Sequence, residues 1–388
     1  IIKKINRGQK DFNAVLGGSG AKGTWLKTFD ADIFVLFNYK KYKDKSGQLS
    51  DILEKTLKKK FKKVARLHGS RDYFQMNKNN FTFEIVPILS IKKAEQAKNI
   101  TDVSPLHSRW VVKHRKLASE MKLMKQFCQA QSVYGAESYI RGFSGYVCEV
   151  LTAYYGSFIN LLRNAAKWQT KAVIDAEKHY RGNDVFKIIN TSKLESPLIV
   201  IDPVQKDRNA AAALSKEKFE AFKKAAYSFL KNPSKGFFIR KDLKSIFFQL
   251  KYNSNKLITI NLTPLAGKID VVGSKLLKSY QFLLQQLQEH GFKVIKTEWD
   301  WDKSGDAIFY FLFDRKPLPK DVEVKGPPLK IEKHVQHFRK LHKRTFRKSG
   351  SIYAIDKRKY CLPEDLLKIL LKDNYVKERA KLTKFAVK

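Results

Sequence analysis

The chain has 388 residues, and its 77 Lys and Arg residues against 37 Asp and Glu residues give a formal net charge of +40. A positive excess of this size indicates a polyanionic partner. Hydrophobic residues make up 43% of the chain and aromatic residues 12%. This is enough to fill the cores of two or three domains, and it argues against disorder over most of the chain.

The three cysteines, Cys128, Cys148 and Cys361, lie far apart in the sequence and form no C-x-x-C pair. The sequence therefore predicts neither a zinc site nor a disulfide framework, and it favours a reducing compartment, the cytoplasm. The most apolar stretch, residues 146–162, is interrupted by polar side chains and is shorter than the roughly 20 apolar residues of a membrane span. We expect no membrane partner.

The first hundred residues predict a small α/β head. Apolar runs at 33–37 and 81–89 are typical of strands, and a lysine-rich helical segment lies between them at 51–62. From about residue 116 to 230 the periodicity is helical, with one strand-like run at 198–201. Two apolar stripes mark the helices, and Ser215 is a plausible N-cap for the second. The stripes are Leu117, Met121, Met124 and Cys128, and Phe219, Phe222, Ala226 and Phe229.

Strands return from residue 236 onward. We predict a strand at 257–262, a helix at 274–290, and two strands at 292–299 and 307–313 joined by the turn "DKSGD". This order is the core of the split βαβ layout of RNA-recognition sheets. Beyond "KGPPLK" we expect a basic helical tail. Its segment "HFRKLHKRTFRK" is either a solvated helix face or a contact for an RNA backbone.

Three glycines, Gly18, Gly20 and Gly23, have the G-x-G-x-x-G spacing of dinucleotide-binding proteins. That fingerprint requires a helix after the third glycine, but here a β-branched and aromatic run follows within a few residues. A P-loop is also disfavoured, because Gly23 is followed by Thr-Trp instead of Lys-Ser or Lys-Thr. The sequence therefore argues against a dinucleotide cofactor.

Three carboxylates are a stronger signal. Asp30 and Asp32 are two residues apart in a predicted strand, so their side chains share one face. Glu84 lies in "FTFEIVPIL", on the face opposite Phe81 and Ile85. One interpretation is that Glu84 pairs with a lysine and Asp30 merely begins a strand. The Gly-Ser loop together with all three acids favours a site for divalent cations, which make such close carboxylates tolerable.

These features resemble the DNA polymerase beta-like nucleotidyltransferases. Over nearly its full length the chain resembles the archaeal-type (class I) CCA-adding enzymes. The matching segments are "GGSGAKGTWL", "DADIFVLF", "SPLHSRW", "VYGAESYIRGFSGYVCEVL", "PLIVIDPVQKDRNAAAALS" and "KGPPLKIEKHVQHF". The resemblance implies an α+β multidomain fold. Residues 1–108 would form a polymerase beta-like nucleotidyltransferase head, 109–235 a helical neck that completes the nucleotide pocket, and 236–388 an RNA-recognition-like α/β body with a basic helical tail.

The activity implied by the resemblance is template-independent addition of CMP, CMP and AMP to the 3′ end of tRNA, from CTP and ATP, with the acceptor arm held by the enzyme. Asp30, Asp32 and Glu84 would bind two Mg²⁺, and Glu84 would also help to deprotonate the primer 3′-hydroxyl. The chain departs from the family at Glu84, where aspartate is usual. The extra methylene shifts the carboxylate by about 1.5 Å. The loop before Asp30 also looks one residue short.

The resemblance further assigns contacts with the incoming nucleotide. Lys22 would neutralise the β- and γ-phosphates, and Arg208 would read the base together with RNA phosphates. Arg141 would either bind a tRNA phosphate or cap a neighbouring helix. The full set of predicted nucleotide contacts is Ser19, Lys22, His107, Lys125, Tyr134 and Arg208.

Two alternatives remain open at this point. The first is a related terminal transferase that makes poly(A) or oligoadenylate, and the second is a tRNA-binding protein that has lost its transferase activity. The three acids favour activity, and the basic tail favours a folded RNA over a short oligonucleotide. The sequence leaves open whether all of CCA is added and what the oligomeric state is, with a homodimer among the alternatives.

Overall fold

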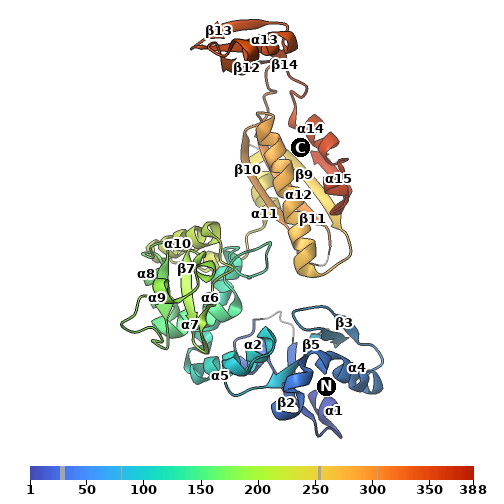
Figure 1. Ribbon diagram of the computed structural model, residues 1–388, viewed down its shortest axis with the longest axis vertical. Helices are drawn as coiled ribbons and strands as arrows, with labels where there is room; N and C mark the ends of the chain where they lie inside the picture. Colours follow the sequence, from blue (N-terminus) through green and yellow to red (C-terminus); the bar gives the residue numbers. More distant parts are fainter. Residues whose placement is uncertain (27–30, 80, 252–254, 304) are drawn as a thin grey trace. The chain divides into compact units, whose positions relative to one another are not determined.

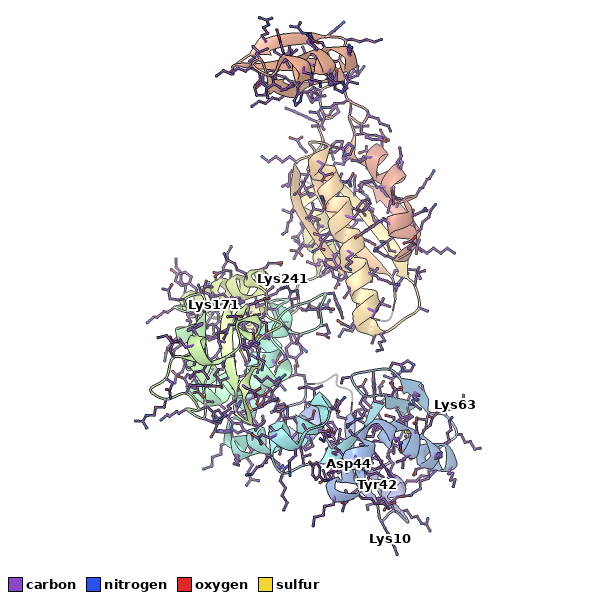
Figure 2. All side chains as sticks on the ribbon, viewed as in Figure 1. Lys10, Tyr42, Asp44, Lys63, Lys171 and Lys241 are labelled. Atoms are coloured by element: carbon purple, nitrogen blue, oxygen red, sulfur yellow. The ribbon has the colours of Figure 1, made fainter. Side chains whose placement is uncertain are left out.

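The computed structural model describes residues 1–26, 31–79, 81–251, 255–303 and 305–388. The chain forms two compact units, Ile1–Lys241 and Asp242–Lys388 (Figure 1). Basic side chains such as those of Lys10 and Lys63 project from the surface (Figure 2). In the described parts of the chain, no helix has both the length and the apolar composition needed to cross a bilayer.

The first unit begins with a five-stranded sheet in the order β1-β2-β5-β4-β3, in which β2 and β5 are parallel and the other pairs antiparallel. The predicted strands and the predicted helix are confirmed, with the helix shifted by two residues. The strands are β1 Phe12–Leu16, β2 Ala31–Asn38, β3 Ala65–Leu67, β4 Tyr73–Lys78 and β5 Phe81–Ser90. The helices are α1 Ile2–Asn6, α2 Gly18–Lys22, α3 Tyr39–Tyr42, η1 Lys43–Gln48, α4 Leu49–Lys60, η2 Ala94–Gln96 and η3 Ile100–Val103.

Helices surround a small sheet in the second part of this unit. Both predicted apolar stripes lie in its core, and Ser215 caps its helix by accepting a hydrogen bond from the Lys218 amide. The helices are α5 Ser104–Lys113, η4 Arg115–Leu117, α6 Ala118–Ala130, α7 Gly145–Tyr155, α8 Phe158–Ala165, α9 Val185–Ile188, η5 Thr191–Leu194, α10 Lys216–Lys231 and η6 Lys235–Phe238. The strands are β6 Ala172–Asp175, β7 Leu198–Asp202 and β8 Gln205–Asn209, in the order β6-β7-β8.

The prediction of a single strand in this region was therefore wrong. Strand β7 is apolar and fully buried, so its sequence shows it clearly. Strand β8 is "QKDRN" and contains no apolar residue, so it has no apolar pattern and is defined only by pairing with β7. Helix α5 joins the two parts of the unit, because Leu106 packs in the core of the first sheet and Trp110 in the core of the helices.

The second unit is built on a four-stranded antiparallel sheet in the order β10-β11-β9-β15. Helices α12 and α14 pack on one face, so the predicted split βαβ layout is present and β15 completes it. The elements are α11 Leu243–Lys251, β9 Asn255–Pro264, α12 Ile269–Glu289, β10 Val294–Asp300, β11 Ala307–Asp314, α14 Pro363–Leu370, α15 Asn374–Lys377 and β15 Ala380–Val387. The sequence analysis missed α11, which covers the other face of this sheet with Phe247.

The tail is an insertion between β11 and α14, and it consists of β12 Asp321–Pro328, α13 Glu332–Leu341, β13 Thr345–Lys348 and β14 Ser351–Lys357 (Figure 1). Beyond residue 330 the expectation of a helical tail is correct for α13, α14 and α15, whereas β13, β14 and β15 are strands. The segment after α13 forms a hairpin, because Ser349 and Gly350 both adopt positive φ angles (48° and 76°), as a two-residue turn of type I′ requires.

Candidate active site

Two of the predicted carboxylates are neighbours in the first sheet. Asp32 on β2 and Glu84 on β5 are register partners across the parallel strand pair. The adjacent Ile33 and Ile85 are in the core, so Asp32 and Glu84 face the opposite side of the sheet. Asp30 lies outside the described residues, and its place in the site stays a prediction. Among the residues that are described, no group of three or more His, Cys, Asp or Glu side chains could hold a metal ion.

The glycine segment packs directly on Asp32. It forms the short helix α2, which ends at Gly23 in the left-handed conformation, where the sequence analysis expected a loop. Gly18 has a φ of +51°, and a Cβ atom at this position would overlap Oδ2 of Asp32. The amide of Gly17 donates a hydrogen bond of 2.8 Å to the Asp32 carbonyl oxygen. Ser19 follows Gly18 in α2, and its carbonyl oxygen accepts a hydrogen bond of 3.1 Å from the Thr24 amide.

A buried carboxylate, Glu149 of α7, joins this segment to the helices. Lys22 Nζ lies 2.8 Å from Glu149 Oε2, and Lys125 Nζ lies 2.6 Å from Oε1. The hydroxyl of Thr24 donates to Oε1 at 2.5 Å and accepts a hydrogen bond from Lys125 at 3.0 Å. Glu149 and Thr24 are fully buried, and Lys125 is 3% exposed. Two lysines that were predicted to contact the nucleotide, from distant parts of the chain, thus share one counter-ion.

The ion pairs of Glu149 with Lys22 and Lys125 favour the ionised form of its carboxylate. Burial alone would raise the pKa of Glu149, but the charges of Lys22 and Lys125 outweigh burial, and the pKa lies below its ordinary value. The two ammonium groups and one carboxylate leave an excess of one positive charge beside α2. That arrangement suits an anionic ligand.

A second buried carboxylate, that of Asp202 at the end of β7, accepts hydrogen bonds from four groups. His107 Nε2 lies 2.9 Å from Oδ2, and Arg208 Nη1 donates to the same oxygen at 2.5 Å. The hydroxyl of Tyr146 and the amide of Val204 donate to Oδ1 at 3.2 and 3.0 Å. Burial would raise the pKa of Asp202, but the hydrogen bond and charge of His107, the Val204 amide and the charge of Arg208 lower it. His107 and Arg208, which were predicted from separate motifs, therefore meet at one anion.

Tyr146 connects the two groups. Its ring centroid lies 5.4 Å from Lys22 Nζ and 4.3 Å from the ring centroid of His107. Burial and the charge of Asp202 raise the pKa of its hydroxyl far above the usual range, which keeps the proton needed for donation. Tyr134 lies beside the first group, because a Cβ atom on Gly145 would lie 2.8 Å from the Tyr134 hydroxyl and 3.6 Å from Lys125 Nζ.

The sequence analysis missed Thr24, Tyr146, Glu149 and Asp202. A signal existed for both acids. Glu149 interrupts the most apolar stretch of the chain, and Asp202 ends a fully buried strand. Charged residues in such places are costly unless they are paired.

Arg141 has a structural role through its backbone. It adopts a positive φ of 56°, and its carbonyl oxygen accepts a hydrogen bond of 2.8 Å from the amide of Ser215, the N-cap of α10. Its side chain is exposed.

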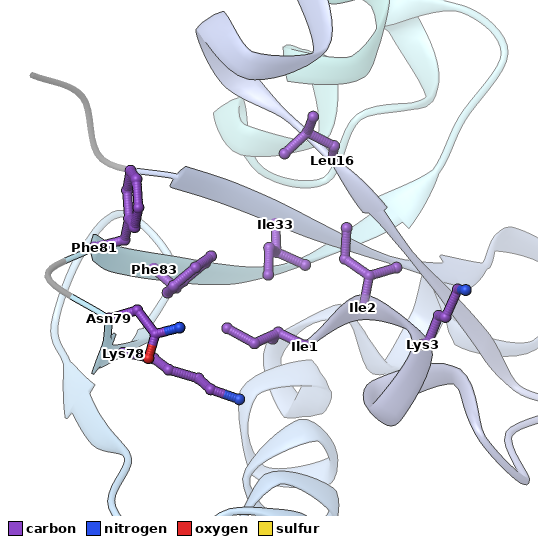
Figure 3. A pocket seen from close by; sticks show the side chains of 9 residues that line it. All are labelled: Ile1, Ile2, Lys3, Leu16, Ile33, Lys78, Asn79, Phe81 and Phe83. Carbon is purple, nitrogen blue, oxygen red and sulfur yellow. The ribbon is translucent and has the colours of Figure 1, made fainter. Parts of the chain in front are cut away.

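An apolar cavity of about 430 Å³ lies elsewhere in the first sheet (Figure 3). Its lining includes Ile33, Phe83 and Leu16, together with Ile1 and Ile2 of the N-terminal segment. Ile33 and Phe83 are on the face of the strands opposite Asp32 and Glu84, so this cavity is separate from the polar groups described above.

Comparison with known proteins assigns the family. Models of three domains match successive parts of the chain: a nucleotidyltransferase domain at residues 1–102, the second domain of tRNA nucleotidyltransferase at 119–239, and the C-terminal domain of the CCA-adding enzyme at 263–378. The CCA-adding enzyme of Nanoarchaeum equitans is 34% identical over 92% of this chain and 86% of the relative. That of Methanocaldococcus jannaschii is 30% identical over 93% of this chain and 81% of the relative. The chain belongs to the archaeal-type CCA-adding enzymes, a family of tRNA nucleotidyltransferases.

Proposed function

We propose that this enzyme adds CMP, CMP and AMP, taken from CTP and ATP, to the 3′ end of tRNA that lacks CCA, without a nucleic-acid template. The observation that best supports this beyond family membership is the meeting of Lys22 and Lys125 at Glu149, beside the helix that packs on Asp32. The positive charge of these lysines would bind a triphosphate next to the carboxylates of Asp32 and Glu84.

The carboxylates fit a site for divalent cations. Asp32 and Glu84 offer oxygen donors from partner positions on one face, which is the chemistry that Mg²⁺ prefers. We propose that they hold two Mg²⁺ together with Asp30, and that the bound ions supply positive charge to the entering and departing oxygens of in-line displacement at the α-phosphorus. Glu84 would accept the proton of the primer 3′-hydroxyl.

Lys22, whose side chain is 11% exposed, would bind the phosphates, and the buried Lys125, which donates to Glu149 and to both oxygens of Thr24, would add its positive charge to the site. Because Glu149 is buried and ionised, it fixes both ammonium groups without cancelling their combined charge. Ser19 and Tyr134 would contribute hydroxyl groups at the edges of the same site. This arrangement lowers the cost of ordering two flexible lysine side chains when the nucleotide binds.

Arg208 would read the base. One of its nitrogens is held by Asp202, and its side chain is 34% exposed, so the remaining donors of its planar guanidinium are available to an acceptor edge or an RNA phosphate. His107 shares the same carboxylate and would approach the nucleotide from α5. The net charge of +40 supports binding of the tRNA acceptor arm through its phosphates.

The test uses tRNA transcripts that end before CCA, after the first C, or after CC, each incubated with one labelled nucleoside triphosphate. We expect CMP incorporation with the first two substrates, AMP with the third, and neither UMP nor GMP with any. A transcript that already ends in CCA is the control and should accept nothing. Long runs of AMP would indicate a poly(A)-type enzyme, and tRNA binding without incorporation would indicate a protein that has lost its activity.

A further inference from the structure

The imidazole of His107 is held at one of its two nitrogens. Nε2 lies 2.9 Å from Oδ2 of Asp202, whose carboxylate is fully buried. Among the residues that the structure describes, none forms a hydrogen bond with Nδ1, and the His107 side chain is 13% exposed. His114 on the same helix differs, because its Nδ1 lies 3.1 Å from the carbonyl oxygen of Trp110. Nδ1 of His107 is therefore available to a ligand.

His107 lies beside the helix that carries Lys22. Its own helix, α5, packs against both α2 and α7. The imidazole ring packs on the ring of Tyr146, with centroids 4.3 Å apart and planes inclined by 36°, and Lys22 Nζ lies 5.4 Å from the centroid of the same tyrosine ring. A triphosphate that binds Lys22 through its terminal phosphates is thus next to the imidazole.

The carboxylate of Asp202 stabilises a protonated imidazole. Burial would raise the pKa of Asp202, but the hydrogen bond and charge of His107, the Val204 amide and the charge of Arg208 hold it below its ordinary value. The carboxylate is therefore ionised at neutral pH. A negative charge at Nε2 favours the imidazolium form, in which both ring nitrogens carry a proton.

The proposed reaction needs a proton for its leaving group. The oxygen between the α- and β-phosphorus atoms keeps both electrons of the bond that breaks, so negative charge develops on the departing pyrophosphate. Ionised carboxylates such as Asp32 and Glu84 accept protons and cannot supply one. An imidazolium gives up its proton near neutral pH far more readily than an ammonium group does, so His107 suits this task better than Lys22.

We propose that His107 is the general acid of nucleotidyl transfer. As the 3′-oxygen of the tRNA bonds to the α-phosphorus and the bond to the bridging oxygen breaks, Nδ1 of the imidazolium donates its proton to the pyrophosphate. His107 becomes neutral and takes up a proton from solvent before the next turnover. Asp202 is a positioning residue that holds Nε2. The inference rests on the proposed function, because it requires a nucleoside triphosphate at Lys22.

The test varies the basicity of the leaving group. CTP is compared with its β,γ-difluoromethylene analogue, whose leaving group is less basic, and its β,γ-methylene analogue, whose leaving group is more basic. The measured quantity is the maximal single-turnover rate of CMP addition to tRNA that ends before CCA. We expect His107→Gln, whose amide can still donate to Asp202, to lower the rate with CTP about 100-fold, because general acid catalysis is lost.

The size of this loss should follow the leaving group. We expect a larger loss with the methylene analogue and a smaller one with the difluoromethylene analogue, since a less basic leaving group needs less help from an acid. The matched control is His114→Gln on the same helix, which should leave all three rates at their wild-type values. Equal fractional losses with the three nucleotides in His107→Gln would overturn the proposal, because they would assign His107 a purely structural or binding role.

A second measurement needs no variant. Rates of the wild-type enzyme in mixtures of H₂O and D₂O should show two protons in transfer, one leaving the 3′-hydroxyl and one reaching the pyrophosphate. A linear dependence on the deuterium fraction, which indicates one proton, would also overturn the proposal. A wild-type enzyme that adds no CMP from CTP would instead count against the proposed function.

Discussion

Lys22 and Glu149 are separated by 127 positions in the sequence and form an ion pair with an N–O distance of 2.8 Å. The contact ties the glycine segment that packs on Asp32 to helix α7, and the carboxylate is completely buried. The positions of Lys22 and Lys125, both predicted to contact the nucleotide, thus depend on an acid that has no predicted contact with the substrate.

Replacing Glu149 should therefore affect both stability and nucleotide binding. We expect Glu149→Gln to lower the free energy of unfolding of the first unit by about 3–5 kcal/mol, because it leaves Lys125 buried without its counter-ion. The KM for CTP and ATP should rise more than kcat falls. Denaturant unfolding and steady-state kinetics measure the two effects. Glu149→Asp, which keeps the charge, should be closer to wild type, and wild-type stability of Glu149→Gln would contradict this account.

The same ion pairs predict a dependence on pH. The charges of Lys22 and Lys125 outweigh burial and hold the pKa of Glu149 below its ordinary value of 4.5. Its stabilising contribution is therefore complete at neutral pH and is lost as the pH falls through the lower pKa of the folded state. Calorimetry should find a constant Tm difference between wild type and Glu149→Gln between about pH 6 and 8, shrinking below about pH 4.5. A difference that grows in acid would be inconsistent with this assignment.

Asp202 and Arg208 should act as one unit in base choice. We expect Arg208→Ala and Asp202→Asn each to reduce the preference for CTP and ATP over UTP and GTP roughly ten-fold, because a charge-assisted hydrogen bond fixes the guanidinium. The double variant should be no worse than Arg208→Ala alone. Incorporation of all four nucleotides at one salt concentration provides the measurement. Additive losses in the double variant would show that Asp202 acts independently of Arg208.

Gly18 provides a test of the contact with Asp32. We expect Gly18→Ala to reduce incorporation by about 100-fold or more, because the added Cβ overlaps the carboxylate and displaces it. The affinity for tRNA should stay near wild type. Gly8→Ala is the matched control, since Gly8 also has a positive φ of 73° but no atom within 4 Å of an added Cβ. Equal losses in both variants would attribute the effect to backbone strain alone.

The carboxylates themselves should be needed for chemistry and not for RNA affinity. We expect Asp30→Asn and Asp32→Asn to abolish incorporation, Glu84→Gln to lose most of it, and Glu84→Asp to retain a part. Binding of tRNA should change little, because we expect basic residues, and not these acids, to contact the RNA phosphates. Full activity of Glu84→Gln would place the third acid elsewhere.

The sequence predicts the elements that have their own pattern. Strands β2 and β5 each contain an apolar run, at residues 33–37 and 85–89, and α10 has both an apolar stripe and a capping serine, so each could be found locally. Strand β8 and the β13–β14 hairpin could not be found in this way, because pairing and turn geometry define them.

The residues of the candidate site likewise include some that the sequence indicates and some whose role only the folded structure shows. Lys22, Arg208, Glu149 and Asp202 all lie in segments that carry the family resemblance, but the roles of the two acids become clear only from their contacts across the fold. The sequence also could not show that Cys128 of α6 and Cys148 of α7 are neighbours. Both thiols are buried, and their sulfur atoms lie 4.0 Å apart.

The insertion of the tail between β11 and α14 has a practical consequence. Its two ends are adjacent, because the amide of Leu318 donates to the carbonyl oxygen of Cys361 at 2.9 Å, and that of Arg358 to Lys320 at 2.7 Å. The tail is therefore a cassette that an internal deletion with a short linker can excise while leaving the ends of the body in place. Shortening the chain from its C-terminus would instead remove β15, an edge strand of the body sheet, before it reached the tail.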